Sequence, residues 1–279
     1  MIILVKNSSN ELMASKATNE DYVRPAAAGR VTLVGAGPGA VDLITLRGQK
    51  ALAEADVVVY DDLANVALLD FCPAGADRIY VGKRAGKHGA IQAEICAVLV
   101  SEAQRGRHVV RLKGGDPLIF GRGGEEERAL AEAGIPFEIV PGVTAATAAG
   151  AMAGIPLTHR QLASAVVFVT GHECSGKPGD AVVDWRALAR LRATLCIYMG
   201  VRRVGVIAAE LRAGGLEGRT PVAVITNATL PSQTVSIGDL DSAETLTAAL
   251  QGQPALIIVG EVVRLAELVE QARINLALV

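Results

Sequence analysis

The residues of this chain that could do chemistry gather in glycine-rich segments, each of which follows a short β-branched run. The longest segment covers residues 109–126 and places five glycines, among them Gly114 and Gly115, around the acid Asp116. Glycine has no Cβ and tolerates positive φ, so this loop lets a ligand come close to the backbone. Asp116 could accept hydrogen bonds from the ammonium or hydroxyl groups of that ligand. The segment lacks G-x-x-x-x-G-K-[ST], which disfavours a nucleoside triphosphate.

A second loop, Gly35-Ala36-Gly37-Pro38-Gly39-Ala40, follows the run of residues 31–34. It also satisfies G-x-G-x-x-G/A, and Asp61 ends the next run about 20 residues on, so a dinucleotide-dependent oxidoreductase is one alternative. A tight turn without a ligand is another. Asp61 could be a ribose ligand, a general base or the cap of a helix that begins near Ala64, and the residues alone favour the cap.

Cations concentrate in the first half of the chain. From Arg78 to Gly124 there are nine Lys and Arg against three Asp and Glu, although the formal net charge of the chain is −2. This imbalance predicts an anion site on one face of the first domain.

The glycine-rich segments must be positioned by strands and helices, which the pattern of apolar residues predicts. From Val31 onward, β-branched runs alternate with Ala/Leu/Glu/Arg stretches of helical period, which predicts an α/β fold with mainly parallel sheets. We expect strands at 31–35, 56–60, 78–82, 108–113 and 137–140, with helices near 44–55, 90–105 and 123–133. After Pro141-Gly142 a second series follows, with strands at 165–170, 194–198, 221–226, 234–237 and 255–260 and a last helix over 262–272. The resulting division is a disordered extension (1–29), two α/β domains (30–142 and 143–265) and a C-terminal helix or tail (266–279).

The net charge, the lengths of the apolar runs and the cysteine spacing exclude several classes of protein. A net charge of −2 gives no field for holding nucleic acid, and no apolar run approaches the roughly 18 residues of a membrane span. The four cysteines are far apart and form no C-x-x-C pair, so we expect reduced thiols and no metal site. The first residues do not read as an export signal, which favours a cytoplasmic protein. Of the isolated residues, we expect His108 and Met199 to pack in the core and Trp185 to anchor a helix.

Taken in order, six segments resemble the uroporphyrinogen-III C-methyltransferases of the tetrapyrrole methylase family. They are Gly35–Gly39, Tyr60-Asp61, Val81-Gly82-Lys83-Arg84, Arg111–Glu126, Pro141-Gly142-Val143-Thr144-Ala145 and Gly154–Arg160. The resemblance spans about residues 30–265 of the 279.

The resemblance implies two α/β domains with S-adenosylmethionine in the cleft between them, within a homodimer and without a metal. It implies Asp61 as proton acceptor and Lys83 as proton donor. It implies cofactor contacts at Pro38, Gly114, Gly115, Asp116, Ile119, Thr144, Ala145, Met199, Ala228 and Ala255. The chain departs from the family pattern at Asp62, Ala64-Asn65, Cys96 and Ala228.

The implied substrate, uroporphyrinogen III, bears eight carboxylates, so its site needs cations. Arg84, Lys87, Arg111, Arg122 and Arg160 are the candidates. The implied reaction is two successive methylations to precorrin-2, with S-adenosylhomocysteine as the second product. The alternatives are a sister precorrin methyltransferase, the oxidoreductase above and a non-catalytic tetrapyrrole carrier.

Overall fold

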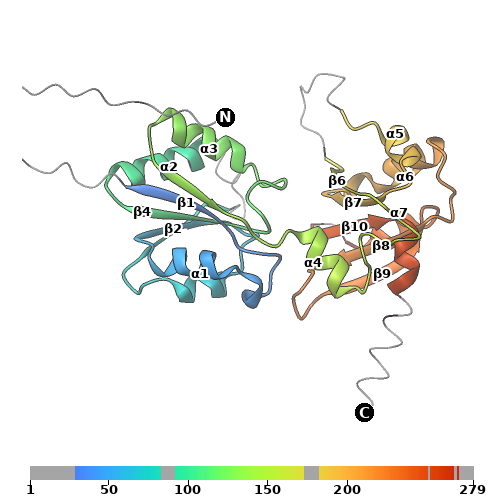
Figure 1. Cartoon of the computed structure of the whole chain (residues 1–279), viewed down its shortest axis with the longest axis horizontal. Coiled ribbons are helices and arrows are strands. Elements are labelled where there is room, and N and C mark those ends of the chain that lie inside the picture. The colour runs from blue at the N-terminus through green and yellow to red at the C-terminus, as the bar shows by residue number, and fades with distance from the viewer. Residues whose placement is uncertain (1–28, 83–91, 173–181, 251, 267–268, 270–279) are drawn as a thin grey trace, which may run out of the picture.

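The computed structural model describes residues 29–82, 92–172, 182–250, 252–266 and 269. They form two α/β units, each built on a five-stranded sheet (Figure 1). Residues 1–28 of the extension expected over 1–29, the segment 83–91, and the C-terminal helix or tail expected over 266–279, apart from Ala266 and Val269, lie outside the described residues. The boundary expected between residues 142 and 143 falls in the segment that joins the last strand of one sheet to the first helix of the other unit.

The first sheet is entirely parallel, with the order β3-β2-β4-β1-β5. Its strands are β1 (Arg30–Gly35), β2 (Val57–Tyr60), β3 (Asp77–Tyr80), β4 (His108–Lys113) and β5 (Phe137–Val140). Every residue of β4 is buried, because helices cover both faces of the sheet. All five strands run the same way, so their carboxyl ends and the glycine-rich loops that follow lie at one edge.

Helices α2 (Gln92–Gln104) and α3 (Gly123–Glu132) cover one face of this sheet, and α1 (Leu46–Ala53) with η2 (Val66–Phe71) covers the other (Figure 1). One core, which includes Leu33, Val59 and Leu99, lies on the α2 side. The second, which includes Val34, Leu52 and Leu68, lies on the α1 side. Alternate residues of each strand therefore feed opposite cores.

The second sheet has the order β6-β7-β10-β8-β9. Its strands are β6 (Val166–Thr170), β7 (Thr194–Tyr198), β8 (Pro221–Thr226), β9 (Thr234–Asp239) and β10 (Ala255–Val259). Only β6 and β7 pair in parallel, and the other three pairings are antiparallel. Parallel pairing still predominates over the two sheets together, as expected, but not within this one.

Helices α5 (Trp185–Arg190), α6 (Val204–Ala213) and α7 (Ala243–Thr247) pack on one face of the second sheet. Helix α4 (Ala145–Met152) and η5 (Glu261–Arg264) pack on the other. Trp185 opens α5 and is 9% exposed, which confirms its expected role as an anchor. The short helices η1 (Val41–Leu43) and η4 (Val201–Arg203) complete the fold. Within the described part of the chain, no helix has the length and apolarity needed to cross a bilayer.

Candidate active site

The loops that follow β1, β4 and β5 are tied together by hydrogen bonds. Gly37 and Gly115 exchange two backbone bonds, of 3.2 and 2.7 Å. The Asp116 carboxylate accepts from Leu118 N through Oδ1 (2.9 Å) and from Gly142 N through Oδ2 (3.1 Å). Asp116 thus fixes its own loop and joins it to the loop after β5, and each oxygen keeps a lone pair for a ligand.

Two glycines let these loops approach closely. A Cβ on Gly142 would lie 2.2 Å from Gly115 O and 2.7 Å from Gly35 Cα, so no side chain fits there. Gly115 has φ +67°, and the atoms nearest to its missing Cβ are Ala145 N and Thr144 Cα at 3.9 Å. The first domain's loops therefore meet the start of α4 directly.

Tyr198, at the end of β7, binds the N-terminus of α4. Its hydroxyl is 2.7 Å from Thr144 Oγ1 and accepts from Ala146 N at 3.0 Å. Burial raises the pKa of Tyr198, so the hydroxyl stays protonated and can donate to Thr144 while it accepts from Ala146. Its ring packs on Phe120, from the loop after β4, with the centroids 4.8 Å apart.

A further bond joins the units from the other side. Ala40 N donates to Thr229 Oγ1 at 2.9 Å, and a Cβ on Gly39 would meet the Leu230 side chain at 3.0 Å. Asn227 N in turn donates to Pro254 O, next to Ala255. The loops after β1 and β8 and the start of β10 thus lie around one junction between the two sheets.

Several residues at this junction have unusual backbone geometry. Among the described non-glycine residues φ is positive at Phe120, Arg122, Met199, Asn227 and Thr229, all in these loops, and also at Arg192 before β7. Such values are strained for most L-residues, above all for β-branched Thr229, and strained positions cluster at functional sites.

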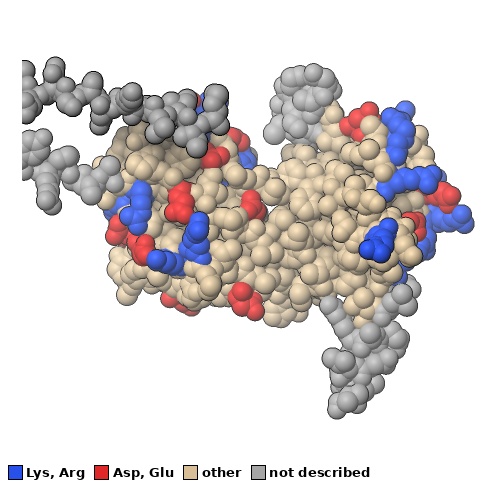
Figure 2. Space-filling model, viewed as in Figure 1, with Lys and Arg blue, Asp and Glu red and all other residues tan. Residues whose placement is uncertain are grey.

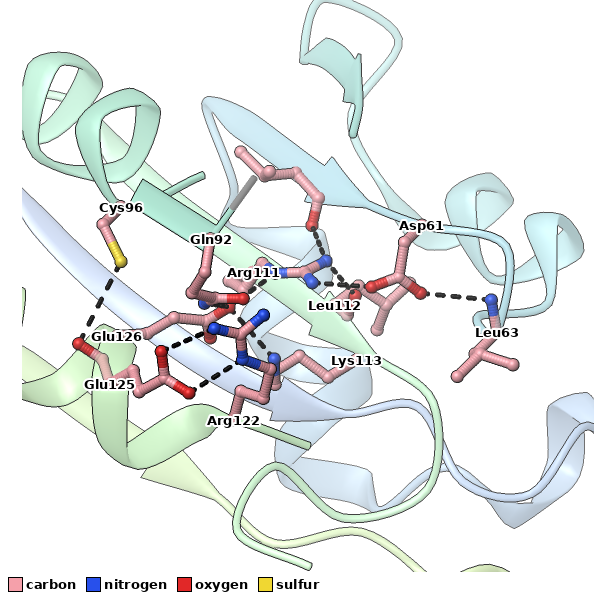
Figure 3. A network of polar contacts seen from close by, with 11 residues as sticks. Asp61, Leu63, Gln92, Cys96, Arg111, Leu112, Lys113, Arg122, Glu125 and Glu126 are labelled. Carbon is pink, nitrogen blue, oxygen red and sulfur yellow. Dashed lines mark hydrogen bonds and ion pairs between the residues drawn. The ribbon is translucent and has the colours of Figure 1, made fainter. Parts of the chain in front are cut away.

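Asp61 lies at the end of β2, where it is held by two different bonds (Figure 3). Oδ2 pairs with Arg111 Nη2 at 2.6 Å, and Oδ1 accepts from Leu63 N at 3.1 Å. The expected helix cap is wrong, because η2 begins at Val66 with Asn65 as its cap. Leu63 also packs on the loop after β4, since a Cβ on Gly114 would lie 2.6 Å from Leu63 Cβ.

The ten residues expected to contact the cofactor all lie on loops or element ends at this junction. Ile119 and Met199 are exposed, and the other eight are half-buried: Pro38, Gly114, Gly115, Asp116, Thr144, Ala145, Ala228 and Ala255. Met199 is 52% exposed, so the expectation that it packs in the core is wrong. Their role as cofactor contacts remains a prediction.

The residues expected to bind the substrate divide into three groups. Arg84 and Lys87 lie outside the described residues, as does Lys83, the expected proton donor. Arg122 is exposed and forms a bidentate pair with Glu125, with both bonds at 2.7 Å, and Arg160 is exposed on the turn between His159 and Ala163.

The expectation that Arg111 binds the substrate is wrong. Its side chain is 3% exposed and donates to Asp61, Glu126 and two backbone carbonyls, so it is buried within the first domain and supports Asp61. On the face of the first domain seen in Figure 2, cations and acids are interspersed and show no patch of one sign.

Other features lie apart from the junction. A cavity of about 650 Å³ is lined by Arg192, Thr194 and Gly260, at the opposite end of β7, and contains none of the predicted site residues. His108 is buried and 2.9 Å from both Thr32 Oγ1 and Glu54 O, which confirms its packing role. The described cysteines, Cys72, Cys96 and Cys196, are free.

Sequence reasoning missed Tyr198 and Thr229 as residues that join the two units. Both stand at strand ends, a signal that was visible, but a hydroxyl's partner depends on the packing of two separate sheets. Asn65 was also missed, although its Nδ2 donates to Gly39 O at 2.7 Å and steadies the first loop.

The chain is similar to known proteins. The family model described as "Tetrapyrrole (Corrin/Porphyrin) Methylases" matches residues 30–244. A siroheme synthase of Baumannia cicadellinicola is 53% identical over 238 residues, 85% of this chain and 51% of the relative. A siroheme synthase of Yersinia enterocolitica is 55% identical over 237 residues, 85% of this chain and 49% of the relative. The chain thus spans about half the length of the curated relatives it matches.

Solved structures are similar over nearly their whole length. The uroporphyrin-III C-methyltransferase of Thermus thermophilus, complexed with S-adenosylhomocysteine, has a TM-score of 0.72 and 41% identity. The similarity covers 85% of this chain and 94% of that one. A cobalt precorrin-4 methyltransferase has a TM-score of 0.76 and 28% identity, covering 87% of this chain and 99% of that one.

Proposed function

This chain belongs to the tetrapyrrole (corrin/porphyrin) methylases, and from that premise we propose that it is an S-adenosylmethionine-dependent uroporphyrinogen-III C-methyltransferase. It transfers two methyl groups in succession to give precorrin-2, without a metal. The substrate assignment draws on the Thermus thermophilus enzyme, which is 41% identical to this chain.

The observation that carries the proposal is the meeting of glycine-opened loops from both units. Gly37, Gly115 and Gly142 are linked by direct bonds or contacts, and Thr144 lies beside Gly115. A ligand held there would contact backbone from both domains. The acceptor oxygens of Asp116 suit the amino and hydroxyl groups of S-adenosylmethionine.

Once bound, S-adenosylmethionine supplies an electrophilic methyl group: an electron pair of the ring forms the new C–C bond, the S–CH3 bond breaks, S-adenosylhomocysteine leaves, and the ring must then lose a proton. The loops hold the reactants in line and exclude water. Asp61, 25% exposed beside the loop of Gly114, accepts that proton. Lys83 is the proposed proton donor. Arg160 is an exposed cation that could bind the carboxylates, and Arg122, now paired with Glu125, would have to exchange that partner for one of them. Arg84 and Lys87 are the other proposed substrate cations.

Anaerobic incubation with methyl-labelled S-adenosylmethionine and uroporphyrinogen III, followed by mass spectrometry, tests the proposal. The expected product carries two labelled methyl groups. Asp116→Ala should retain its fold but lose cofactor binding, measured by calorimetry, because it removes acceptors from the loop. Absence of any methylated product from the unsubstituted chain would contradict the assignment.

A sister precorrin methyltransferase is the second candidate, favoured by the TM-score of 0.76 to the cobalt precorrin-4 enzyme. The same assay with precorrin-2 as substrate separates the two. Methylation of precorrin-2 without methylation of uroporphyrinogen III would support the sister activity.

We also propose that the protein is a cytoplasmic homodimer, as the family resemblance implies. Light scattering coupled to size exclusion measures the mass in solution. A mass near twice the 28.9 kDa of the chain is the expected result, and a mass of one chain at assay concentration contradicts it.

A further inference from the structure

Behind Asp61, four charged side chains form a continuous row of alternating sign (Figure 3). Asp61 pairs with Arg111, Arg111 with Glu126, and Glu126 with Lys113. The side chains of Arg111, Glu126 and Lys113 are 3%, 0% and 6% exposed, whereas that of Asp61 is 25% exposed. The row therefore begins in the core under α3 and reaches solvent at Asp61.

The row arises from strand alternation. Arg111 and Lys113 are two residues apart on β4, so both side chains point to the face covered by α2 and α3. Glu126 faces them from α3, and Gln92 of α2 donates to the same Glu126 Oε1 at 3.0 Å. Asp61 is reached because β2 is the neighbour of β4 in the sheet.

Every nitrogen of the Arg111 guanidinium is engaged. Nε donates to Glu126 Oε1 at 3.3 Å, and Nη1 donates to the carbonyls of Leu112 and Val59 at 3.0 and 3.4 Å. Nη2 is left to donate to Asp61 Oδ2 at 2.6 Å. A planar group fixed on three sides can offer its last donor in one direction only. Together with the bond from Leu63 N to Oδ1, it sets the orientation of the Asp61 carboxylate.

Stability alone does not account for this row. Buried ion pairs contribute little net stability compared with apolar side chains of similar volume, because each charge loses its hydration. Glu126 Oε2 is also buried without a hydrogen-bond partner among the described residues, which adds to the cost. Burial lowers the pKa of Lys113, Arg111 lowers it further, and Glu126 opposes both. The row is costly to bury and ends on the partly exposed carboxylate of Asp61. We therefore infer that its role is to fix the position of that carboxylate.

We propose that Arg111 and Glu126 are positioning residues for the reaction: Arg111 holds the Asp61 carboxylate in its orientation beside the loop of Gly114, and Glu126 holds Arg111. The proposal rests on the proposed function, in which Asp61 accepts the proton released by the methylated ring. It assigns no substrate contact to either residue.

A double-mutant cycle tests it. Asp61→Asn should lower kcat by about 10²–10⁴-fold, the range of a general base. Arg111→Met should lower kcat by about 10–100-fold, as loss of an orienting partner does, with KM for S-adenosylmethionine unchanged. If Arg111 acts through Asp61, the double variant loses no more than Asp61→Asn alone. Losses that multiply would overturn the proposal.

Glu126→Gln keeps the shape of the side chain and carries the test if Arg111→Met does not fold, with an expected loss in kcat of about tenfold. The matched control is Glu102→Gln, because Glu102 of α2 is 10% exposed and pairs with Arg105 and Arg107 away from the junction. It should lower stability and leave kcat unchanged. A kcat loss in the control equal to that of Glu126→Gln would make the effect merely structural and refute the proposal.

The crystal structure of Arg111→Met separates this proposal from the proposed function. Asp61 is expected to leave its present orientation even if the unsubstituted chain does not methylate uroporphyrinogen III. An unchanged Asp61 carboxylate would refute the positioning role, whatever the activity.

Discussion

Replacing Tyr198 with Phe tests whether one hydroxyl sets the start of α4 against the cofactor loops. The substitution keeps the ring that packs on Phe120 and Phe168 and removes only the hydroxyl. Two hydrogen bonds disappear, at 2.7 Å to Thr144 and 3.0 Å from Ala146 N. At about 0.5–1.5 kcal/mol each, the free energy of unfolding should fall by about 1–3 kcal/mol.

The same change should weaken S-adenosylmethionine binding. Thr144 is a proposed cofactor contact, and loss of its fixed position is worth about 1 kcal/mol, which corresponds to a dissociation constant about fivefold higher. Urea denaturation measures the first quantity and calorimetric titration the second. Thr32→Val is the matched control, since it removes one buried hydrogen bond, to His108, within the first domain.

Thr32→Val should lower stability by about 1 kcal/mol and leave cofactor binding unchanged. The reasoning fails if Tyr198→Phe is destabilised as expected but binds S-adenosylmethionine as tightly as the unsubstituted chain.

Three further predictions follow from other parts of the structure. Gly142→Ala should destabilise the protein by about 1–3 kcal/mol and abolish cofactor binding, because the new Cβ would overlap Gly115 O. Gly75→Ala is the control and should do neither, because no atom lies within 4 Å of the position of its Cβ. Burial raises the pKa of Cys196 to about 12, so iodoacetamide at about pH 8 should label it only after unfolding, as mass spectrometry would show; labelling of the folded protein would contradict this. Burial lowers the pKa of His108 in the folded protein from its ordinary value of 6.5. As the pH drops below about 6.5, the unfolded chain therefore binds a proton at this residue before the folded protein does, and the free energy of unfolding falls. The free energy of unfolding of His108→Gln, measured by urea denaturation, should change less between about pH 7 and 5.5 than that of the unsubstituted chain.

Much of the fold could be predicted from the sequence because its strands are short, β-branched and punctuated by glycine. The run at residues 108–113 corresponds to β4 residue for residue, since its flanking turns fix both ends. The antiparallel pairings of β8, β9 and β10 could not be predicted, because a fully apolar run such as residues 255–259 carries no mark of its neighbour's direction. Strand order is decided by tertiary packing.

The site was predictable as a set of loops but not as a set of contacts. Asp116 and Gly115 stand out by residue type and spacing. The role of Arg111 does not, because the same side chain can serve a ligand's carboxylate or a protein's own, and burial alone separates the two cases. A count of charges along the sequence assigns Arg111 to the substrate, whereas the structure shows that it is buried and pairs with Asp61.

The residues with positive φ at the junction bear on any attempt to raise the thermal stability of this protein. At Met199, Asn227 and Thr229, glycine would fit the backbone with less strain, whereas Phe120→Gly would also remove the ring that packs on Tyr198. Thr229→Gly would also release Ala40, whose N–H donates to the Thr229 hydroxyl across the junction. At Thr229, relief of backbone strain and the bond that joins the two units are therefore opposed, so selection for heat resistance alone would act against that bond.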